Sequence, residues 1–372
     1  MEVAVVAVVV VETVKMTKKG KLIAAMSGGV DSSVAAAHYV KLGYEVIGIT
    51  LKLKSCDDTK EKVKSCCGVD DNIQARMAAK KLGIKHYFLD VREQFKEKIL
   101  DYTWDEYTNG RTPNPCARCN YFLKFGALLD YADKVGADGV ITGHYAVLER
   151  GEDGNTRLIR GDDDKKNQTY FLCLLEQEHL NRSYMPLGKL TKPEVREMAR
   201  EFGLANADKT ESQDACFGYK GETFTTTLSR RYDNVPPAGD IITEDGKVVG
   251  KHNGIHHFTI GQRKGHGVAL GKPAYVIKIE KETNQVIVST DSSRLMKTTL
   301  EAKGINWLQI PGDEFECTAQ IRYNQKPMTA KVTRVGDTQA NVEFYEEVRA
   351  ITSGQTITMY EGGMVLAGGW IV

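Results

Sequence analysis

Short apolar runs alternate with amphipathic stretches through the first half of the chain. The apolar runs predict buried strands at 22–26, 45–51, 86–90 and 139–142. Residues of helical periodicity lie between them and predict helices at 30–43, 70–83, 94–107 and 119–135. A chain in which strands and helices alternate this way forms a parallel sheet with helices on both faces, so we expect an α/β domain.

The pattern changes near Gly218, where glycine and proline become frequent and short alternating runs replace the helical stretches. The segment 241–249 contains Asp245-Gly246, a hairpin turn signal. Further strands are predicted at 274–289, 315–323, 328–335, 340–344 and 356–360. We therefore expect a small linking domain and a C-terminal antiparallel β-barrel or sandwich. The predicted division is an extension at 1–20, an α/β domain at 21–218, a central domain at 219–295 and a C-terminal domain, for which we favour the barrel, at 296–372.

Composition narrows the class of protein without naming a function. The chain has 372 residues, 41% of them hydrophobic and 27% charged, as is usual for a globular protein with two or three domains. The net charge of +1 requires any RNA to meet a local basic patch. Eight cysteines without a secretory signal indicate reduced thiols and a cytoplasmic protein. The valine-rich run at 3–11 is too short to span a membrane. We expect it to be a frayed extension or the result of a misassigned start, with Met16 as the natural start.

A glycine- and serine-rich turn between the first strand and the first helix is the strongest chemical signal. Residues 27–33 read SGGVDSS. Glycines let the backbone approach a phosphate closely, and the start of the following helix adds N–H donors. Asp31 can cap that helix or help to hold Mg²⁺. The spacing fits neither a Walker loop nor a dinucleotide fingerprint. It resembles the PP-loop ATP pyrophosphatases, which cleave ATP to AMP and pyrophosphate while adenylating a substrate oxygen.

The cysteines indicate which of the reactions known for such a loop this chain would carry out. Cys116 and Cys119 lie in TPNPCARCN at 112–120, and Cys216 lies in KTESQDACF at 209–217. An adenylated carbonyl carbon needs a sulfur nucleophile; a thiolate or persulfide supplies it, and a second thiol can release the product as a disulfide. The alternative is that Cys116 and Cys119 form half of a structural zinc site, although the sequence has no second CxxC and no HxxxH pair near them to complete it.

Several further motifs make the chain resemble one family, the bacterial tRNA-specific 2-thiouridylases and their mitochondrial homologues. Beside the stretches above, the motifs are TGHY at 142–145, NQTYFL at 167–172, GQRKG at 261–265, RY at 322–323 and SGQ at 353–355. The resemblance runs from about Lys21 to the C-terminus. It implies ATP-dependent 2-thiolation of the wobble uridine, position 34, in the tRNAs for lysine, glutamate and glutamine. The uracil 2-oxygen would be adenylated and then replaced by sulfur.

The resemblance also implies a role for individual residues. Cys119 takes the position of the nucleophile and Cys216 that of the persulfide carrier. The implied ATP-binding residues are Ala25, Met26, Ser27, Gly28, Gly29, Val30, Asp31, Ser32, Leu51 and Gly143. The implied tRNA contacts are Asn114, Pro115, Cys116, His144, Lys166, Asn167, Gln168, Arg322, Tyr323 and Gln355. The implied partners are tRNA and a sulfur donor, either a cysteine desulfurase or a sulfur-relay protein, with no membrane.

Three positions depart from the family pattern. Cys116 stands where many members have aspartate, so Cys116, Cys119 and Cys216 are candidate ligands of a [4Fe–4S] cluster with one iron open to sulfide. Asn167 replaces a common aspartate, and Leu51 replaces a frequent methionine. The expected cofactors are therefore ATP and Mg²⁺, with the cluster as the alternative to a persulfide and disulfide pair.

Two other functions compete with tRNA thiolation. A PP-loop synthetase that adenylates a small molecule would leave the cysteines and the barrel without a role. A non-catalytic iron–sulfur or zinc RNA-binding protein would leave residues 27–33 without one. The thiolase hypothesis makes a geometric demand that neither alternative makes: the phosphate loop and the thiols of Cys119 and Cys216 must face a common pocket.

Overall fold

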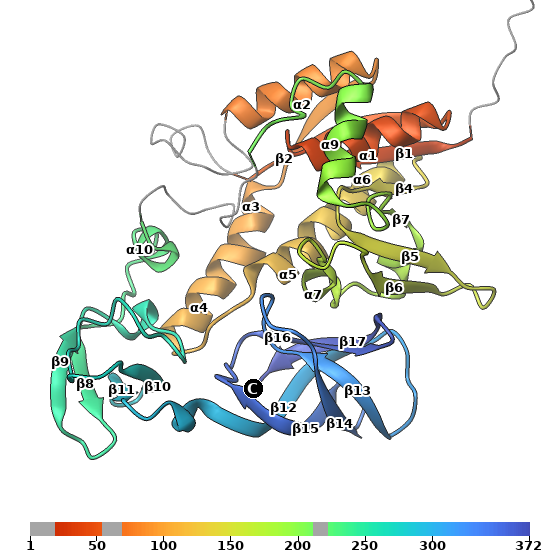
Figure 1. The fold of residues 1–372 in the computed structure, drawn as a ribbon. Helices are drawn as coiled ribbons and strands as arrows, with labels where there is room; N and C mark the ends of the chain where they lie inside the picture. The colour runs from red at the N-terminus through yellow and green to blue at the C-terminus, as the bar shows by residue number, and fades with distance from the viewer. Residues whose placement is uncertain (1–18, 54–68, 211–221) are drawn as a thin grey trace, which may run out of the picture.

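The computed structural model describes residues 19–53, 69–210 and 222–372. Three parts follow one another along the chain: an α/β layer, a small β domain and a β-barrel (Figure 1). The α/β layer lies at one end of the molecule, and the barrel lies at the other end, beneath the hairpin of residues 146–160. Among the described residues, no helix is long and apolar enough to cross a membrane.

A parallel sheet forms the centre of the α/β layer, as predicted, and it has five strands where four were expected. Its strands, in spatial order, are β3 (Lys85–Asp90), β2 (Glu45–Lys52), β1 (Lys21–Ala25), β4 (Gly139–Ile141) and β7 (Ser183–Tyr184). Every neighbouring pair is parallel. Successive side chains of β1 point to opposite faces, and Leu22 and Ile23 are both fully buried. A central strand covered on both faces explains why its sequence is apolar without alternation.

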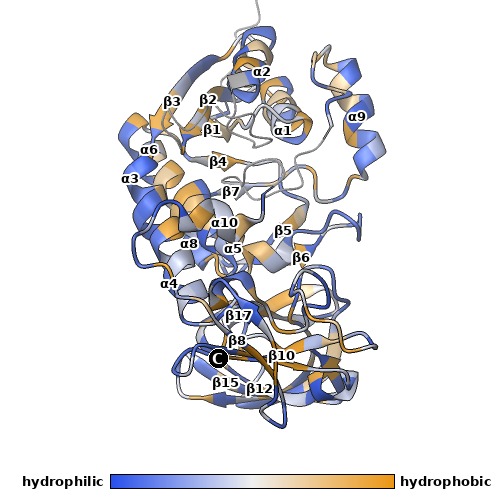
Figure 2. Cartoon of the chain, turned by 90° about the vertical axis from the view of Figure 1, so that its left-hand side faces the viewer, coloured by the Kyte–Doolittle hydropathy of each residue, from blue (hydrophilic) through white to orange (hydrophobic). Residues whose placement is uncertain are grey.

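Helices cover both faces of this sheet. One face packs against α1 (Val30–Lys41), α2 (Val69–Lys81) and α9 (Lys192–Glu201) in a core that includes Leu22. The opposite face packs against α6 (Leu128–Val135) in a second core that includes Ile23. In Figure 2 the outward turns of α9 carry polar residues. The doubly wound arrangement predicted from the alternating pattern is confirmed.

Each of the two helical stretches after β3 contains a π-helical segment. The elements are α3 (Arg92–Phe95), η2 (Lys96–Asp101), α4 (Tyr102–Thr108), α5 (Pro115–Cys119) and η3 (Asn120–Ala127), with α6 continuing from η3. The second stretch begins at Pro115, four residues before the predicted start. Asn114 is its N-cap, and the Asn114 side chain accepts a hydrogen bond from the backbone N–H of Ala117 at 3.2 Å. Proline suits this first helical position because its missing N–H would be unpaired there in any case.

Several elements in the second half of the α/β part had no prediction, β7 and α9 among them. The others are β5 (Ala146–Arg150), β6 (Thr156–Arg160), α7 (Thr169–Leu172) and α8 (Gln177–Asn181), and α10 (Phe224–Ser229), which follows the α/β part, had none either. The β5–β6 hairpin leaves the parallel sheet and pairs with the barrel, where Ile159 of β6 faces Met364. Sheet membership of this kind depends on a partner about 200 residues away, so local patterning does not predict it.

The central β domain contains the predicted hairpin. Its elements are β8 (Gly239–Thr243), β9 (Val248–His252), η4 (Ile255–His257), β10 (Tyr275–Glu280), β11 (Gln285–Ser289) and η5 (Ser292–Leu295). The four strands lie in the order β10, β11, β8, β9. Gly246 has φ of +84° in the turn between β8 and β9, as the Asp-Gly signal requires.

Six antiparallel strands close into a barrel at the C-terminal end, as expected. They are β12 (Met296–Trp307), β13 (Glu314–Gln320), β14 (Met328–Val335), β15 (Gln339–Arg349), β16 (Thr356–Glu361) and β17 (Met364–Ile371). Pairing of β12 with β17 closes the ring. No strand was predicted at β12 or β17. The glycines of β17 weaken its pattern, yet a Cβ on Gly368 would lie 2.4 Å from the Cβ of Cys173, so close packing requires glycine there.

Candidate functional site

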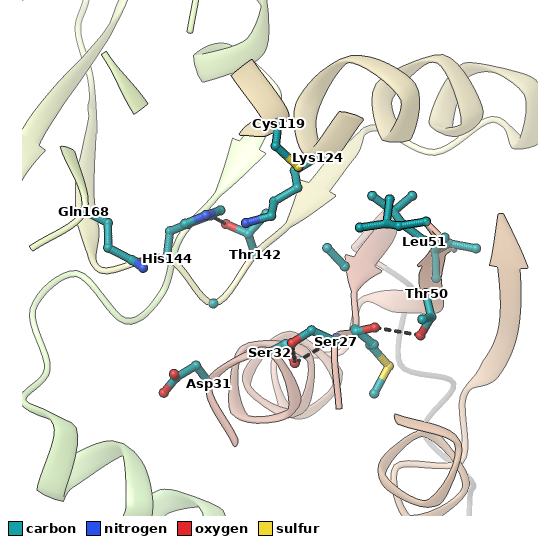
Figure 3. A pocket seen from close by; sticks show the side chains of 15 residues that line it. Ser27, Asp31, Ser32, Thr50, Leu51, Cys119, Lys124, Thr142, His144 and Gln168 are labelled. Carbon is teal, nitrogen blue, oxygen red and sulfur yellow. Dashed lines mark hydrogen bonds between the residues drawn. The ribbon is translucent and has the colours of Figure 1, made fainter. Parts of the chain in front are cut away.

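A pocket opens at the carboxyl ends of β1, β2 and β4, the edge at which open α/β sheets bind ligands. Its lining combines the phosphate loop, the ends of the strands and the helices that follow Pro115 (Figure 3). The lining residues are Ala25, Met26, Ser27, Asp31, Ser32, Ile49, Thr50, Leu51, Leu53, Cys119, Lys124, Thr142, Gly143, His144 and Gln168.

The serines of the phosphate loop hold its backbone in a tight turn. The Ser32 hydroxyl accepts a hydrogen bond from the backbone N–H of Ser27 at 3.2 Å and donates one to the Gly29 carbonyl at 3.1 Å. Ser33 donates to the same carbonyl at 3.0 Å. Gly29 is the N-cap of α1, and no side chain accepts from the first N–H groups of the helix. These N–H groups and the positive end of the helix dipole form an anion-binding site.

Gly28 is required by both its backbone angle and its surroundings. Its φ is +76°, and a Cβ there would lie 2.1 Å from the carbonyl oxygen of Asp71 in α2. The Gly28 carbonyl accepts hydrogen bonds from the side chains of Asn206 at 3.2 Å and Lys209 at 3.1 Å. Lys209 also pairs with Asp71. The loop is thus fixed from outside by residues far away in the sequence.

Asp31 does not cap α1, which was one of the two roles predicted for it. Its carboxylate accepts hydrogen bonds from the Lys192 ammonium at 2.7 and 2.8 Å and from the Tyr145 hydroxyl at 2.8 Å. The reason is positional: Asp31 lies in the first turn of α1 and faces α9, whose first residue is Lys192. Its carboxylate lines the pocket and provides the hard oxygen ligands that Mg²⁺ prefers.

The two cysteines of the CxxC motif differ in exposure. Cys119 at the end of α5 is 8% exposed and lines the pocket with the phosphate loop, whereas Cys116 is exposed. Cys216, the predicted persulfide carrier, lies outside the described residues, as do Cys56, Cys66 and Cys67. Within the described ranges, no three His, Cys, Asp or Glu side chains are grouped so that they could hold a metal ion. The predicted cluster, which also needs Cys216, therefore stays a prediction.

His144 and Lys124 occupy the wall opposite the phosphate loop (Figure 3). Burial lowers the pKa of His144 well below its ordinary value, and the nearby Lys124 ammonium lowers the pKa further, so His144 is neutral. Its Nδ1 forms a hydrogen bond with the Thr142 hydroxyl at 2.9 Å, and its ring stacks on Phe125 with centroids 5.6 Å apart. His144 lies just beyond the end of β4, as predicted.

Most of the predicted ATP-binding residues line this pocket. Seven of the ten do so, namely Ala25, Met26, Ser27, Asp31, Ser32, Leu51 and Gly143. The other three, Gly28, Gly29 and Val30, complete the turn and the start of α1. Gly143 sits tightly against α1, since a Cβ there would lie 2.7 Å from the backbone nitrogen of Ser32. ATP binding by these residues is a prediction for which the structure provides the cavity.

The predicted tRNA contacts fall into two groups. His144 and Gln168 line the pocket. The others lie outside it, and several of them connect parts of the fold. The Asn114 side chain donates to the Thr356 hydroxyl of the barrel at 2.9 Å, and Gln355 donates to the Thr112 and Pro113 carbonyls at 3.1 Å.

Two more of these residues make internal contacts. The Arg322 guanidinium donates to the carbonyls of Ile260 and Ala350 at 3.0 and 2.8 Å, and the carbonyl oxygen of the Asn167 side chain accepts from the Thr169 hydroxyl at 3.1 Å.

Tyr323 is 36% exposed and is thus open to a nucleotide. Pro115 begins α5, Cys116 is exposed, and Lys166 donates its N–H to the Asp163 carbonyl at 2.9 Å. The tRNA roles of this group stay predictions.

Sequence reasoning missed Lys124, Lys192 and Thr50. Lys124 was a detectable candidate, because it is a basic residue within an apolar helical stretch five positions after Cys119. The Thr50 hydroxyl donates to the Met26 carbonyl at 2.6 Å and fixes the end of β1 beside the loop. Lys192 gave no local signal, because its partner Asp31 lies 161 residues away.

Comparison with known proteins covers nearly the whole chain. Residues 20–220 match the family model described as tRNA methyl transferase HUP domain. Residues 227–290 match the tRNA methyl transferase PRC-barrel domain, and residues 297–371 match the aminomethyltransferase beta-barrel domain.

Two curated relatives are similar over their full length. The tRNA-specific 2-thiouridylase MnmA of Carboxydothermus hydrogenoformans is 45% identical over 357 residues, covering 94% of this chain and 97% of the relative. The protein of the same name from Geobacter metallireducens is 42% identical over 363 residues, covering 96% and 98%. A solved 4-thiouridine synthetase–RNA complex with bound ATP is only distantly similar, with 18% identity, a TM-score of 0.34, and coverage of 53% of this chain and 45% of that one.

Proposed function

The chain belongs to the family of tRNA-specific 2-thiouridylases, and from this premise we propose that it uses ATP to replace the 2-oxygen of a tRNA uridine with sulfur. The proposed target is the wobble uridine, position 34, of the tRNAs for lysine, glutamate and glutamine. The proposed by-products are AMP and pyrophosphate, the products typical of a PP-loop enzyme.

One observation carries this proposal: the phosphate loop and the Cys119 thiol line the same pocket (Figure 3). Ser27 and Cys119 come from separate elements, the turn after β1 and the end of α5. If the protein were a synthetase acting on a small molecule, Cys119 would have no function in this pocket. If it were a non-catalytic RNA-binding protein, the phosphate loop would have none. A sulfur transfer that follows adenylation uses both.

The proposed reaction uses the phosphate loop and Cys119, which line the pocket, and Cys216, which lies outside the described residues and takes its role from the family resemblance. The uracil 2-oxygen attacks the α-phosphorus of ATP held on the loop, and pyrophosphate leaves. The outer sulfur of the Cys216 persulfide attacks C2, and AMP leaves with the former 2-oxygen. The Cys119 thiolate then attacks the sulfur of Cys216, and the S–S bond breaks with its electron pair on the sulfur that stays on the base. The resulting Cys119–Cys216 disulfide is reduced by an external thiol before the next turnover.

Side chains around the pocket support these steps. The N–H groups at the start of α1 would bind the phosphates, and Mg²⁺ would neutralise part of their charge beside the Asp31 carboxylate. His144, buried and neutral, can hydrogen-bond to the uracil or adenine without adding charge. The target base has to leave the anticodon stack to reach the pocket. The central domain and the barrel would therefore bind the rest of the tRNA.

The sulfur donor belongs to the proposal too. A cysteine desulfurase or a relay protein would deliver a sulfane sulfur to Cys216. No step is assigned to an iron–sulfur cluster, because the two described candidates differ in exposure: Cys116 is exposed, whereas Cys119 is buried in the pocket wall. Chemically, a persulfide and a second thiol suffice for the transfer.

Nucleoside mass spectrometry tests the proposal. The chain is expressed in a bacterium that lacks its own 2-thiouridylase, and 2-thiouridine derivatives are measured in digested tRNA. We expect expression to restore them, and a Cys119→Ser variant to leave them absent at equal protein level. Restored 2-thiouridine with the Cys119→Ser variant would remove Cys119 from the chemistry. No 2-thiouridine with the unaltered, folded chain and a compatible sulfur donor would refute thiolation.

A further inference from the structure

The proton on N3 of the target uracil has no acceptor in the steps above. When the 2-oxygen attacks phosphorus, the ring becomes positively charged, and N3 must lose its proton to make the adenylated base neutral. The 2-thiouracil product carries a proton on N3 again. The proposed reaction therefore needs a group in the pocket that accepts this proton and later returns it.

Four of the described residues that line the pocket are ionisable, namely Asp31, Cys119, Lys124 and His144. The Asp31 carboxylate is paired with the Lys192 ammonium at 2.7 Å on the side of the phosphate loop. Cys119 is the nucleophile of the proposed sulfur transfer, and the Lys124 ammonium has no lone pair that could take a proton. His144 is neutral, so its imidazole is the remaining proton acceptor in this lining.

The His144 ring is held from two sides. The residue is 7% exposed, its Nδ1 forms a hydrogen bond with the Thr142 hydroxyl at 2.9 Å, and its ring stacks on Phe125 at an interplanar angle of 30°. No described residue forms a hydrogen bond with its Nε2. Because the ring lines the cavity, this nitrogen is left for a substrate (Figure 3).

The bond to Thr142 is compatible with the tautomer that the reaction needs. A neutral imidazole carries a proton on one nitrogen and a lone pair on the other. If Nδ1–H donates to the Thr142 hydroxyl, the lone pair of Nε2 faces the cavity. A substrate N–H that reaches Nε2 selects this tautomer, and uracil N3–H is such a donor.

The surroundings of His144 also favour return of the proton. Burial, and after it the Lys124 ammonium on η3, lowers the pKa of His144. The imidazolium is therefore short-lived, and the ring accepts a proton only from a strong acid. N3–H is such an acid while the adenylated ring is positively charged. After sulfur has replaced the 2-oxygen and the S–S bond has broken, the ring is an anion and takes the proton back.

We propose that Nε2 of His144 takes the N3 proton of the target uracil during adenylation and returns it once sulfur is in place. In the first step the N3–H bond breaks, its electron pair stays on N3, and pyrophosphate leaves ATP. In the last step the N3 lone pair forms a new N–H bond, and His144 is neutral again. This inference rests on the proposed function and adds a catalytic residue to its adenylation step.

Single-turnover release of pyrophosphate tests this inference without a sulfur donor. The substrate is a tRNA for lysine that carries either uridine or 5-fluorouridine at position 34 and is otherwise unchanged. Fluorine makes N3–H more acidic. For each variant, the ratio of the wild-type rate to the variant rate is compared between the two tRNAs, so an effect of fluorine on the 2-oxygen itself cancels.

His144→Gln is the main variant, because glutamine can form hydrogen bonds but cannot take a proton near neutral pH. We expect it to slow pyrophosphate release about 100-fold with uridine and only about tenfold with 5-fluorouridine, which needs less help from a base. Its affinities for ATP and tRNA should stay within about threefold of wild type. His179→Gln, at a partly buried histidine of α8 outside the pocket, is the control and should keep both rates.

An equal loss of rate with both tRNAs would mean that His144 only shapes the pocket, and this result would overturn the inference. A loss explained by weaker binding of ATP or tRNA would overturn it too. If His144→Gln does not fold, as judged by circular dichroism, Thr142→Val takes its place, since it keeps the imidazole and removes the partner of Nδ1. We expect Thr142→Val to slow release about tenfold with uridine and less with 5-fluorouridine. An unchanged rate in that variant would contradict the proposal.

Failure of this inference is distinguishable from failure of the proposed function. If the unaltered, folded chain releases no pyrophosphate with ATP and the uridine tRNA, adenylation of tRNA is wrong, and the role of His144 falls with it. If the unaltered chain releases pyrophosphate and His144→Gln loses the same factor with both tRNAs, adenylation stands and proton transfer by His144 is wrong.

Discussion

Lys192 donates hydrogen bonds to both carboxylate oxygens of Asp31, at 2.7 and 2.8 Å, from a position 161 residues further along the chain. The Tyr145 hydroxyl donates to the same carboxylate at 2.8 Å. The pair joins the start of α9 to the first turn of α1, beside the loop proposed to bind ATP. An ammonium placed where two helix N-termini meet strengthens an anion-binding site. When no anion is bound there, a carboxylate balances its charge.

Replacing Lys192 with methionine is expected to weaken ATP binding about tenfold, because one cation is lost beside the phosphates. The unpaired, partly buried Asp31 is expected to cost about 1–2 kcal/mol of the free energy of unfolding. Calorimetric titration with ATP and urea unfolding measure the two effects. Lys189→Met, an exposed lysine nearby, is the control. Wild-type ATP affinity in Lys192→Met would show that the pair is structural only.

Gly28→Ala is expected to abolish detectable ATP binding. The new Cβ would meet the Asp71 carbonyl oxygen at 2.1 Å, and alanine disfavours the φ of +76° at this position, so the loop must shift. Gly246→Ala is a matched control, since Gly246 has φ of +84° and a Cβ added there would have no atom within 4 Å. ATP titration of both variants separates the clash from the strain of a positive φ. Retained ATP affinity in Gly28→Ala would argue against phosphate binding at this turn.

Cys116→Ser distinguishes the two sulfur chemistries that the sequence left open. Transfer by a persulfide and disulfide pair needs Cys119 and Cys216, so we expect Cys116→Ser to keep most of its thiolation activity. A [4Fe–4S] cluster with Cys116 as a ligand would lose both iron and activity. Iron content and 2-thiouridine formation are measured on protein purified without oxygen. Joint loss of iron and activity in Cys116→Ser would favour the cluster.

Tyr323→Ala is expected to weaken tRNA binding. The ring is 36% exposed and lies against Phe171, with centroids 4.5 Å apart and planes tilted by 36°, and its exposed part is a surface on which an unstacked base can lie. Stacking on an aromatic ring contributes about 1–3 kcal/mol per base, so the dissociation constant should rise roughly 5- to 150-fold. Fluorescence anisotropy with labelled tRNA measures it. Tyr345→Ala, at a 57% exposed tyrosine of the barrel, is the control and should bind normally.

His256 should make the protein less stable in acid. It is 1% exposed between Trp104 and His257, and burial, with a smaller contribution from His257, lowers its pKa to about 4. The unfolded chain, with a histidine pKa near 6.5, binds more protons between these values. The contribution of neutral His256 to stability is therefore fully present above about pH 6.5. As the pH drops toward 4, the free energy of unfolding falls by about 2–3 kcal/mol. Urea unfolding at pH 7.5 and pH 5 should show a smaller drop for His256→Phe than for the wild type. An equal drop in both would exclude this residue as the cause.

Elements whose signals are local could be predicted from the amino-acid sequence. The strand at Lys21–Ala25, the turn at 27–33 and the helix from Val30 are set by apolar residues, glycines and serines within a few positions of one another. Such signals survive without tertiary context because backbone preference and short-range hydrogen bonds produce them. The change to short strands in the second half predicted the barrel for the same reason.

The set of side chains that line the pocket depends on tertiary packing. Cys119 lines the cavity of the phosphate loop because α5 packs beside the carboxyl ends of the strands, and Lys124 joins it through a π-helical turn that periodicity does not predict. The pairing of Asp31 with Lys192, and of the β5–β6 hairpin with β17, likewise depends on how distant segments pack. Contacts between residues more than 100 positions apart depend on burial and shape complementarity in the whole fold. A local sequence pattern therefore indicates which side chains are present, but not which partners they contact.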